Sequence, residues 1–389
     1  MMTSNAVELA KSVLQEFFGE ENGYIAACLL ENGALPLSLI VYKLKLPSTK
    51  VKKGLAILIQ HHVVITDGIN GKPFYRCRLN TIENLLRSSR YCLAVKTLFG
   101  EHGEEIVEEL IARGELNFIE CCKKVATRLE CEESKVRIIF HKLCAAQFIK
   151  RCPEVCNEEQ SGESNTSAVI LPKLVEPKNP FQMPILNAQT NNTVMQPKKR
   201  KLDDINDLEN LWMVNFTKFW NYYRDELIVE LIKNLSDENG EAVMRALLRL
   251  SEMKSNPSAS CSYTLSAHDL WRELQAESGR VGVDISRSTM DKTLLFLSDM
   301  QQRILRRLGD SGGGIYVIDY AKAAEVLCQV TIEAVVSERF GSKAVRIFRL
   351  LRNKKYLEQN EIEKLGMLSN KEGKHLLYQL VAEGFIHVK

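Results

Sequence analysis

Residues 55–66 read LAILIQHHVVIT and indicate how this chain folds, because the spacing of their apolar residues returns three more times. Two apolar residues three positions apart lie on one face of a helix, and an apolar residue five positions later opens an extended run. The four copies are Leu55, Leu58 and Val63; Phe140, Leu143 and Phe148; Leu297, Met300 and Leu305; and Leu377, Leu380 and Phe385. A helix, a turn and a strand form the second half of a winged helix, so the repeat predicts tandem units.

The sequence around the first copy predicts one complete winged helix. Amphipathic helices are expected over 6–18 and 24–32, and a shorter helix follows Pro36. Ser48 or Thr49 is expected to cap the next helix, which runs to His61. Strands at 63–66 and 74–79, with the turn signals Asp67-Gly68 and Asn70-Gly71 between them, complete the unit as a hairpin.

The same patterns predict a mainly α chain with small β-hairpins, organised as four tandem, extended winged-helix domains. The expected parts are winged helix 1 at 1–100, winged helix 2 at 101–152, a linker at 153–204, winged helix 3 with flanking helices at 205–341, and winged helix 4 at 342–389. The fourth is expected to be truncated before its wing, after a strand at 385–388.

The segment 153–204 differs in composition from the rest of the chain. It holds six prolines together with Ser, Asn, Gln and Glu, which is typical of a disordered linker or an inserted wing loop. A long helix is expected to follow over 208–235. Its aromatic residues from Trp212 to Tyr223 favour packing into a domain interface over stacking on single-stranded bases.

The composition is that of an ordinary globular protein, with 45% hydrophobic and 26% charged residues and a net charge of +3. No apolar run reaches the roughly 18 residues that a membrane span needs, and the first ten residues do not resemble a secretory signal. The eleven cysteines are scattered through predicted helices, which indicates reduced thiols in the cytosol or nucleus.

The sequence predicts no catalytic residue, no metal site and no cofactor. The segment Gly309–Gly314 includes the Gly-Asp-Ser-Gly-Gly of chymotrypsin-like proteases, but its helical surroundings favour a wing turn over a nucleophile at Ser311. The closest metal-type pairings are Cys152 with Cys156 and Cys121 with Cys122; His141 and Cys144 could complete a four-ligand set only by chance.

Basic residues gather on the predicted third helices and wings, where winged helices approach phosphates. The candidate DNA-binding residues are Lys50, Lys52, Lys53, Lys72, Arg76, Arg78, Lys123, Lys124, Lys135, Arg137, Arg303, Arg306 and Arg307. A solvated helix face remains the alternative for any one of them. Few side chains on these helices suit base edges, so we expect DNA contact that is largely independent of sequence. A separate basic cluster, Lys198, Lys199, Arg200 and Lys201, has the form of a nuclear localisation signal.

Several phrases resemble the C-three family of RNA polymerase III, which supplies the winged-helix component of that enzyme's peripheral initiation heterotrimer. The phrases are LQEFFGE at 14–20, VKKGL at 51–55, ILIQH at 57–61, IVEEL at 106–110, FIKRCP at 148–153 and AVRIFRL at 344–350. The resemblance covers the chain outside the linker, and the family is related to the large subunit of transcription factor IIE.

The resemblance implies a non-catalytic subunit of a nuclear polymerase that acts in promoter opening and initiation at small RNA genes. The implied partners are two smaller heterotrimer subunits, the polymerase clamp and DNA, with no membrane. Family members continue beyond the fourth winged helix, so docking that needs the further segment is in doubt for this chain. A free-standing winged-helix regulator or scaffold is the alternative function.

Overall fold

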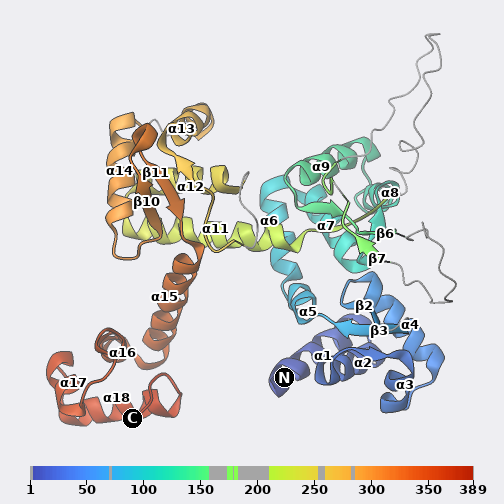
Figure 1. Cartoon of the computed structure of the whole chain (residues 1–389), viewed down its shortest axis with the longest axis horizontal. Helices are drawn as coiled ribbons and strands as arrows, with labels where there is room; N and C mark the ends of the chain where they lie inside the picture. Colours follow the sequence, from blue (N-terminus) through green and yellow to red (C-terminus); the bar gives the residue numbers. More distant parts are fainter. Residues whose placement is uncertain are drawn as a thin grey trace, which may run out of the picture. The chain divides into compact units, whose positions relative to one another are not determined.

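A computed structural model describes residues 3–69, 72–156, 173–177, 179–182, 210–252, 259–281 and 285–388 of the chain. It is mainly helical, with small antiparallel sheets (Figure 1). The chain divides into two compact units, Met1–Phe219 and Trp220–Lys389. No helix within the described ranges has the length and apolar character needed to cross a bilayer.

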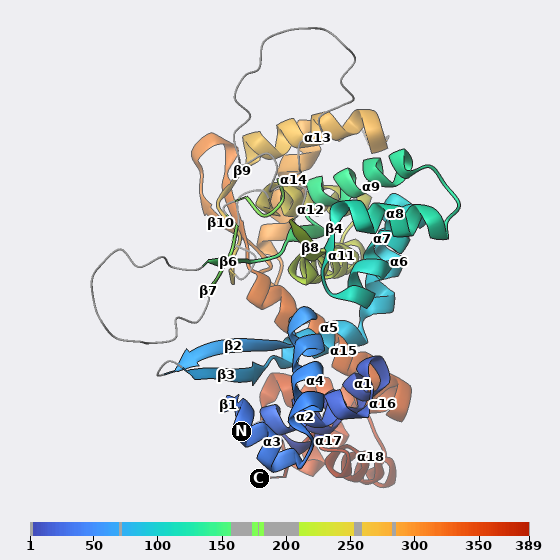
Figure 2. The same cartoon turned by 90° about the vertical axis from the view of Figure 1, so that its right-hand side faces the viewer.

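The first bundle is formed by helices α1 (Ser4–Phe18), α2 (Glu20–Asn32), α3 (Leu37–Leu44) and α4 (Ser48–Gln60). Strands β1 (Leu35–Pro36), β2 (Val64–Ile69) and β3 (Lys72–Cys77) form its sheet in the order β1-β3-β2. Figure 2 shows β2 and β3 as a hairpin beside these helices. The predicted helices and hairpin are therefore confirmed. Two helices that the patterns did not predict follow, α5 (Leu79–Leu86) and α6 (Ser88–Phe99).

Helix α4 packs closely against α2. A Cβ atom on Gly54 would lie 2.5 Å from Asn22 Oδ1 and 2.6 Å from Ile25 Cδ1, so a larger residue would displace these two buried side chains. The predicted cap of α4 is wrong: Pro47 occupies the N-cap position, and no side chain accepts a hydrogen bond there.

The second bundle is formed by α7 (Glu101–Arg113), α8 (Phe118–Arg128) and α9 (Glu133–Ala145). Its sheet has the order β4-β8-β5, with β4 at Leu116–Asn117, β5 at Ile149–Arg151 and β8 at Leu211–Val214. Strand β8 is thus the central strand, although it comes after the proline-rich segment. The helix predicted over 208–235 is wrong at its start, because α11 begins only at Phe216 and ends at Leu235.

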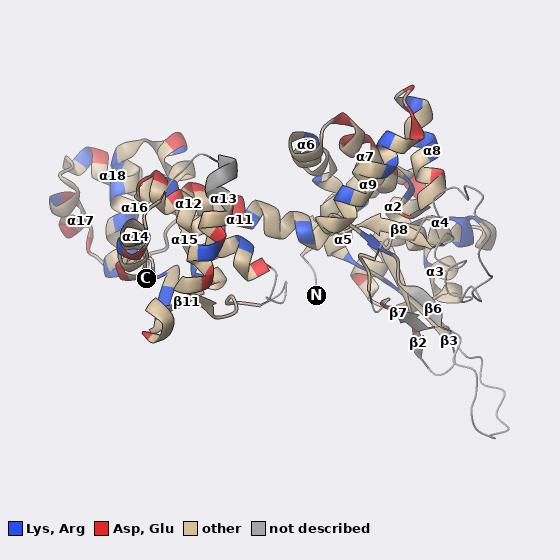
Figure 3. Cartoon of the chain, turned by 90° about the horizontal axis from the view of Figure 1, so that it is seen from above, with Lys and Arg blue, Asp and Glu red and all other residues tan. Residues whose placement is uncertain are grey.

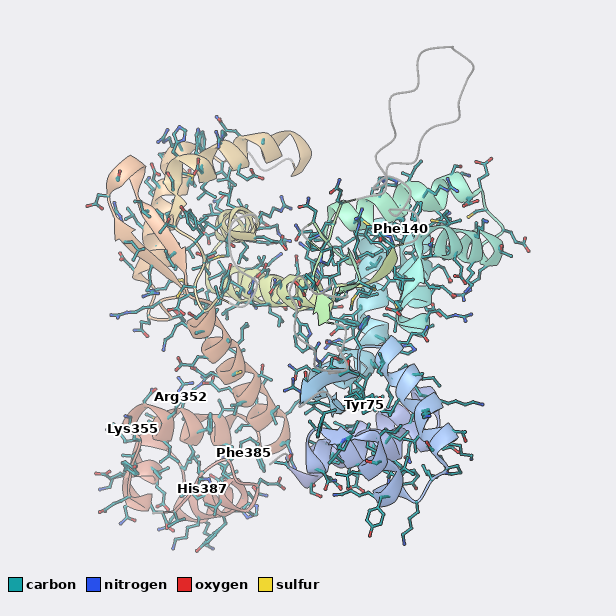
Figure 4. All side chains as sticks on the ribbon, turned by 45° about the vertical axis from the view of Figure 1, so that its right-hand side comes forward. Tyr75, Phe140, Arg352, Lys355, Phe385 and His387 are labelled. Carbon is teal, nitrogen blue, oxygen red and sulfur yellow. The ribbon has the colours of Figure 1, made fainter. Side chains whose placement is uncertain are left out.

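The side chains of β8 explain why this segment forms a strand. Trp212 and Val214 alternate with exposed or half-buried neighbours, and Trp212 is fully buried. The Trp212 ring meets the edge of Phe140, which lies inside the second bundle (Figure 4), at 5.5 Å between ring centroids. Inside the predicted linker, β6 (Glu154–Cys156) pairs antiparallel with β7 (Lys173–Val175).

The third bundle follows α11 and contains α12 (Glu238–Glu252), α13 (Ala267–Val281) and α14 (Arg287–Asp299). Strands β9 (Leu265–Ser266), β10 (Leu305–Gly309) and β11 (Ile315–Ile318) form a sheet in the order β10-β11-β9. One hydrophobic core joins these elements. Between β10 and β11 lies a 3-10 turn, Ser311–Gly313, in which Gly312, Gly313 and the following Gly314 all have positive φ. The prediction of a turn at Ser311 is confirmed.

The fourth bundle has a separate core and is formed by α15 (Tyr320–Phe340), α16 (Ser342–Lys354), α17 (Gln359–Gly366) and α18 (Asn370–Ala382). The strand predicted at 385–388 is wrong, because these residues form no strand. Phe385 instead packs on this core, with its ring edge against Phe340 at 5.8 Å.

The repeated apolar phrase has a common backbone structure in three of its four copies. His62, Gln147 and Gly384 end their helices with φ of 55°, 64° and 75°. The next residue then donates its N–H to the carbonyl five positions earlier, over 2.9 to 3.0 Å: Val63 to Leu58, Phe148 to Leu143 and Phe385 to Leu380. This is a Schellman ending, which places two apolar residues against one another. The third copy departs from it, since Arg303 has the positive φ and Leu305 follows two residues later.

Candidate nucleic-acid interface

Helix α4 presents three lysines on the surface of the first bundle. Val51, Leu55 and Leu58 are buried, and this spacing leaves Lys50, Lys52 and Lys53 on the exposed side of the helix. The basic segments of α4 are visible in Figure 3. Helix α4 therefore offers a positive surface to solvent.

The three lysines differ in their partners. Lys50 Nζ lies 2.6 Å from Glu21 Oε1, in an exposed ion pair with α2. Lys52 and Lys53 form no ion pair with any acidic side chain in the described residues. Their charge is therefore available to a phosphate without first breaking an internal contact.

The hairpin of the first bundle contributes one further unpaired cation. Arg76 pairs with Asp67 on the neighbouring strand at 2.9 Å. Arg78 follows β3, is exposed, and has no acidic partner in the part of the chain that the structure describes. The side chain of Lys72 lies outside the described residues.

In the second bundle two of the four predicted basic residues, Lys124 and Arg137, are held by carboxylates, and so is Arg128. Glu109 is only 3% exposed and forms two ion pairs. Its Oε2 lies 2.7 Å from Arg128 Nη2, and its Oε1 lies 4.0 Å from Lys124 Nζ. Lys124 also pairs with Glu120 at 2.6 Å, and Arg137 pairs with Glu133 at 2.7 Å. The contacts to Glu109 join α8 to α7, so these cations have a structural role.

Lys123 and Lys135 are the exceptions in the second bundle. Both are exposed, and neither forms an ion pair with a described acidic side chain. In the third bundle Arg306 pairs with Asp319 at 3.3 Å and Arg307 pairs with Asp310 at 2.8 Å. Arg303 is exposed and unpaired among the described residues.

The structure therefore divides the predicted residues into two groups. The six exposed cations without a described acidic partner are Lys52, Lys53, Arg78, Lys123, Lys135 and Arg303. The sequence could not make this division, since several of the carboxylates concerned lie on other elements. In the fourth bundle, too, a basic residue is paired with a carboxylate on another helix: Arg352 of α16, labelled in Figure 4, lies 2.9 Å from Glu333 of α15. The cluster 198–201 lies outside the described residues.

Comparisons with known proteins identify the family. Three family models match: the RNA polymerase III subunit RPC82 helix-turn-helix domain at residues 8–65, RNA polymerase III subunit RPC82 at 138–327, and the POLR3C C-terminal winged-helix domain at 332–389. The resemblance found in the sequence is confirmed by these matches.

Curated relatives agree with the family models. DNA-directed RNA polymerase III subunit RPC3 of Rattus norvegicus is 33% identical over 413 residues, covering 100% of this chain and 76% of the relative. The human protein of the same name is 32% identical over 414 residues with the same coverage. A relative from Dictyostelium discoideum is 21% identical over 199 residues, 48% of this chain and 29% of that protein. The chain belongs to the RPC3 family of RNA polymerase III subunits, the family whose models carry the name RPC82.

Proposed function

We propose that this chain is a non-catalytic subunit of RNA polymerase III that acts in promoter opening and initiation at small RNA genes. The observation that carries the proposal is the similarity to RPC3 proteins over the whole chain. Similarity of this extent covers all four bundles, so it concerns the architecture of the subunit and not one shared module.

The four bundles are the means by which the chain would dock its partners. We regard them as four tandem winged-helix domains, a count supported by the recurrence of a bundle of at least three helices and by a small sheet in each of the first three. Each bundle buries its own apolar residues and leaves different side chains exposed, so each presents a different surface. The proposed partners are two smaller subunits of the initiation heterotrimer and the polymerase clamp.

Contact with DNA is proposed for the exposed cations of the first bundle. Lys52, Lys53 and Arg78 are not neutralised by described acidic side chains, and lysine and arginine at such positions bind phosphates without reading bases. The expected contact is therefore salt-sensitive and independent of sequence. We also propose that the chain is nuclear, and that Lys198, Lys199, Arg200 and Lys201 direct it there.

Affinity purification of the tagged full chain from nuclear extract tests this proposal. We expect the catalytic subunits of RNA polymerase III to be recovered after treatment with nuclease, which removes any bridging DNA. The tag alone serves as the control. Recovery of the chain without polymerase subunits would contradict the proposal and would favour a free-standing winged-helix regulator or scaffold.

A further inference from the structure

Three side chains that can bind a metal ion converge where the first and second bundles meet. His62 follows α4, Glu115 precedes β4 and Cys152 follows β5. Their potential ligand atoms all lie within 4.8 Å of one another, and His62 Nε2 is 3.7 Å from Glu115 Oε2. No other group of three such residues occurs among the described side chains.

The His62 ring presents to the cluster a ring nitrogen without a hydrogen-bond partner in the described part of the chain. Its Nε2 is buried and has no hydrogen-bond partner among the described residues, although a buried polar atom without a partner is destabilising. A neutral imidazole offers its nitrogen lone pair to a cation.

Cys152 and Glu115 complete the donor set. The Cys152 side chain is 7% exposed and is hydrogen-bonded to the Glu115 carboxyl group. An ordinary cysteine thiol carries its proton at neutral pH. A divalent cation would replace that proton, which passes to solvent. One thiolate and one carboxylate would then balance the two positive charges.

The backbone around the cluster is held by contacts that do not depend on a metal. Gln60 Nε2 donates a hydrogen bond to the Arg113 carbonyl at 3.0 Å. Gly114 has φ of 79°, and a Cβ atom there would lie 2.4 Å from the Gln60 carbonyl oxygen. The end of α4 and the end of α7 are thus in contact beside the cluster, and this contact brings His62 and Glu115 together.

We propose that His62 Nε2, the Glu115 carboxylate and the Cys152 thiolate bind one zinc ion that joins the first bundle to the second, with water as the fourth ligand. Nitrogen, sulfur and oxygen donors in this combination suit Zn²⁺. Tetrahedral ligands at about 2.0 to 2.3 Å from zinc lie roughly 3.3 to 3.8 Å apart. The His62–Glu115 separation of 3.7 Å lies in this range, and all three ligand atoms are within 4.8 Å of one another, so zinc would draw Cys152 inward where needed. No sequence pattern indicates the site, because its three ligands come from distant positions.

Metal titration of the full chain tests the proposal. The purified protein is treated with EDTA, dialysed, and titrated at neutral pH with ZnCl₂ against a chromophoric chelator, and separately with CoCl₂. We expect one equivalent of zinc to bind and to raise the thermal unfolding midpoint, because the ion binds only the folded arrangement. Cobalt should give the thiolate charge-transfer band and the visible bands of a tetrahedral site.

Variants assign the ligands. Cys152→Ser and His62→Gln should each weaken zinc binding at least about tenfold, and Glu115→Gln should weaken it in the same direction. Cys131→Ser and His102→Asn are matched controls outside the cluster and should bind zinc as the wild type does. Far-UV circular dichroism verifies that each variant is folded.

Two results would overturn the proposal. One is wild-type protein that binds less than one equivalent of zinc or gives a cobalt spectrum without the thiolate band. The other is a folded Cys152→Ser variant that keeps wild-type zinc affinity. The first result needs no variant, so the proposal can fail even if a substitution prevents folding.

Discussion

Single residues with positive φ follow three helices of this chain, α4, α9 and α18. His62, Gln147 and Gly384 occupy the same position in three copies of the repeated phrase, one residue before the apolar residue that packs back on its helix. Two of these positions are not glycine, although an L-residue in the left-handed region is strained by roughly 1 to 2 kcal/mol. At His62 the side chain has a further use in the proposed zinc site.

Gln147 offers a test of this strain, because its side chain is exposed. We expect Gln147→Gly to change the free energy of unfolding by at most about 1 kcal/mol in the stabilising direction, since relief of strain outweighs the added freedom of the unfolded chain. Urea unfolding followed by circular dichroism measures the change.

The reverse substitution is the control. Gly384→Ala puts a Cβ atom into open space at φ of 75°, so only backbone strain changes, and it should destabilise the fourth bundle. These positions would carry no strain if Gly384→Ala left the free energy of unfolding unchanged and Gln147→Gly lowered it.

At the scale of elements, β8 shows the limit of a hydrophobic pattern. The run of aromatic residues from Trp212 onward fits one long helix, yet residues 211–214 become the central strand of the second bundle. The reason lies in the partners: β4 and β5 leave a gap that an added strand fills with hydrogen bonds, and Trp212 fills the core beside it. Tertiary context overrides local propensity here.

Helices α15 and α16 are joined by one carboxylate. The side chain of Glu333 is 12% exposed. Its carboxylate forms ion pairs with two arginines of α16: Oε2 lies 2.8 Å from Arg349 Nη2, and Oε1 lies 2.9 Å from Arg352 Nη1. Burial by itself would raise the pKa of Glu333, but hydrogen bonds from Arg349 and Gln329 and the charges of the two arginines outweigh it and lower the pKa. The folded chain therefore holds the proton less tightly than the unfolded chain does.

This shift predicts a pH dependence of stability. The stabilisation that ionised Glu333 contributes to the folded chain is fully present above the ordinary carboxyl pKa of 4.5. It is lost as the pH falls through the lower pKa that Glu333 has in the folded chain. We expect Glu333→Gln to lower the free energy of unfolding by about 1 to 2 kcal/mol at neutral pH, and the difference from wild type to shrink on acidification. Urea unfolding at neutral and acid pH measures both.

Glu338→Gln is the matched control on the same helix. Glu338 is exposed and has no ion-pair partner within the described residues, so its replacement should have little effect at either pH. An effect of Glu333→Gln that stays constant from neutral to acid pH would contradict the electrostatic explanation.

At the scale of the whole molecule, the net charge of +3 conceals an uneven distribution of free cations. Many basic side chains are used in ion pairs within their own bundle, and Lys52 and Lys53 of α4 are exposed without such partners among the described residues. Affinity for DNA should follow these unpaired residues and not the total number of lysines and arginines.

Replacement of both lysines tests this expectation. Lys52→Gln with Lys53→Gln should weaken binding equally for unrelated duplexes and reduce the slope of log affinity against log salt by about 2, because each lysine releases about one counterion. Fluorescence anisotropy over a range of salt concentrations measures the slope.

A second pair of lysines supplies the control. Lys96→Gln and Lys124→Gln remove the same charge, but each of these lysines is paired with a glutamate at 2.6 Å. Their replacement should change the slope far less. A loss that is confined to one DNA sequence, or an equal loss in the control, would contradict non-specific phosphate contact by α4.

Most of the helices, the two strands of the first hairpin and the family of this protein could be predicted from the sequence, because apolar periodicity and local phrases depend only on neighbouring residues. Thus the helices at 4–18, 48–60 and 133–145 could be located in advance. Three features required the folded chain: which cations are free, which strand completes the second sheet, and that His62, Glu115 and Cys152 meet. Each of these depends on contacts between residues far apart in the chain, which no local pattern records.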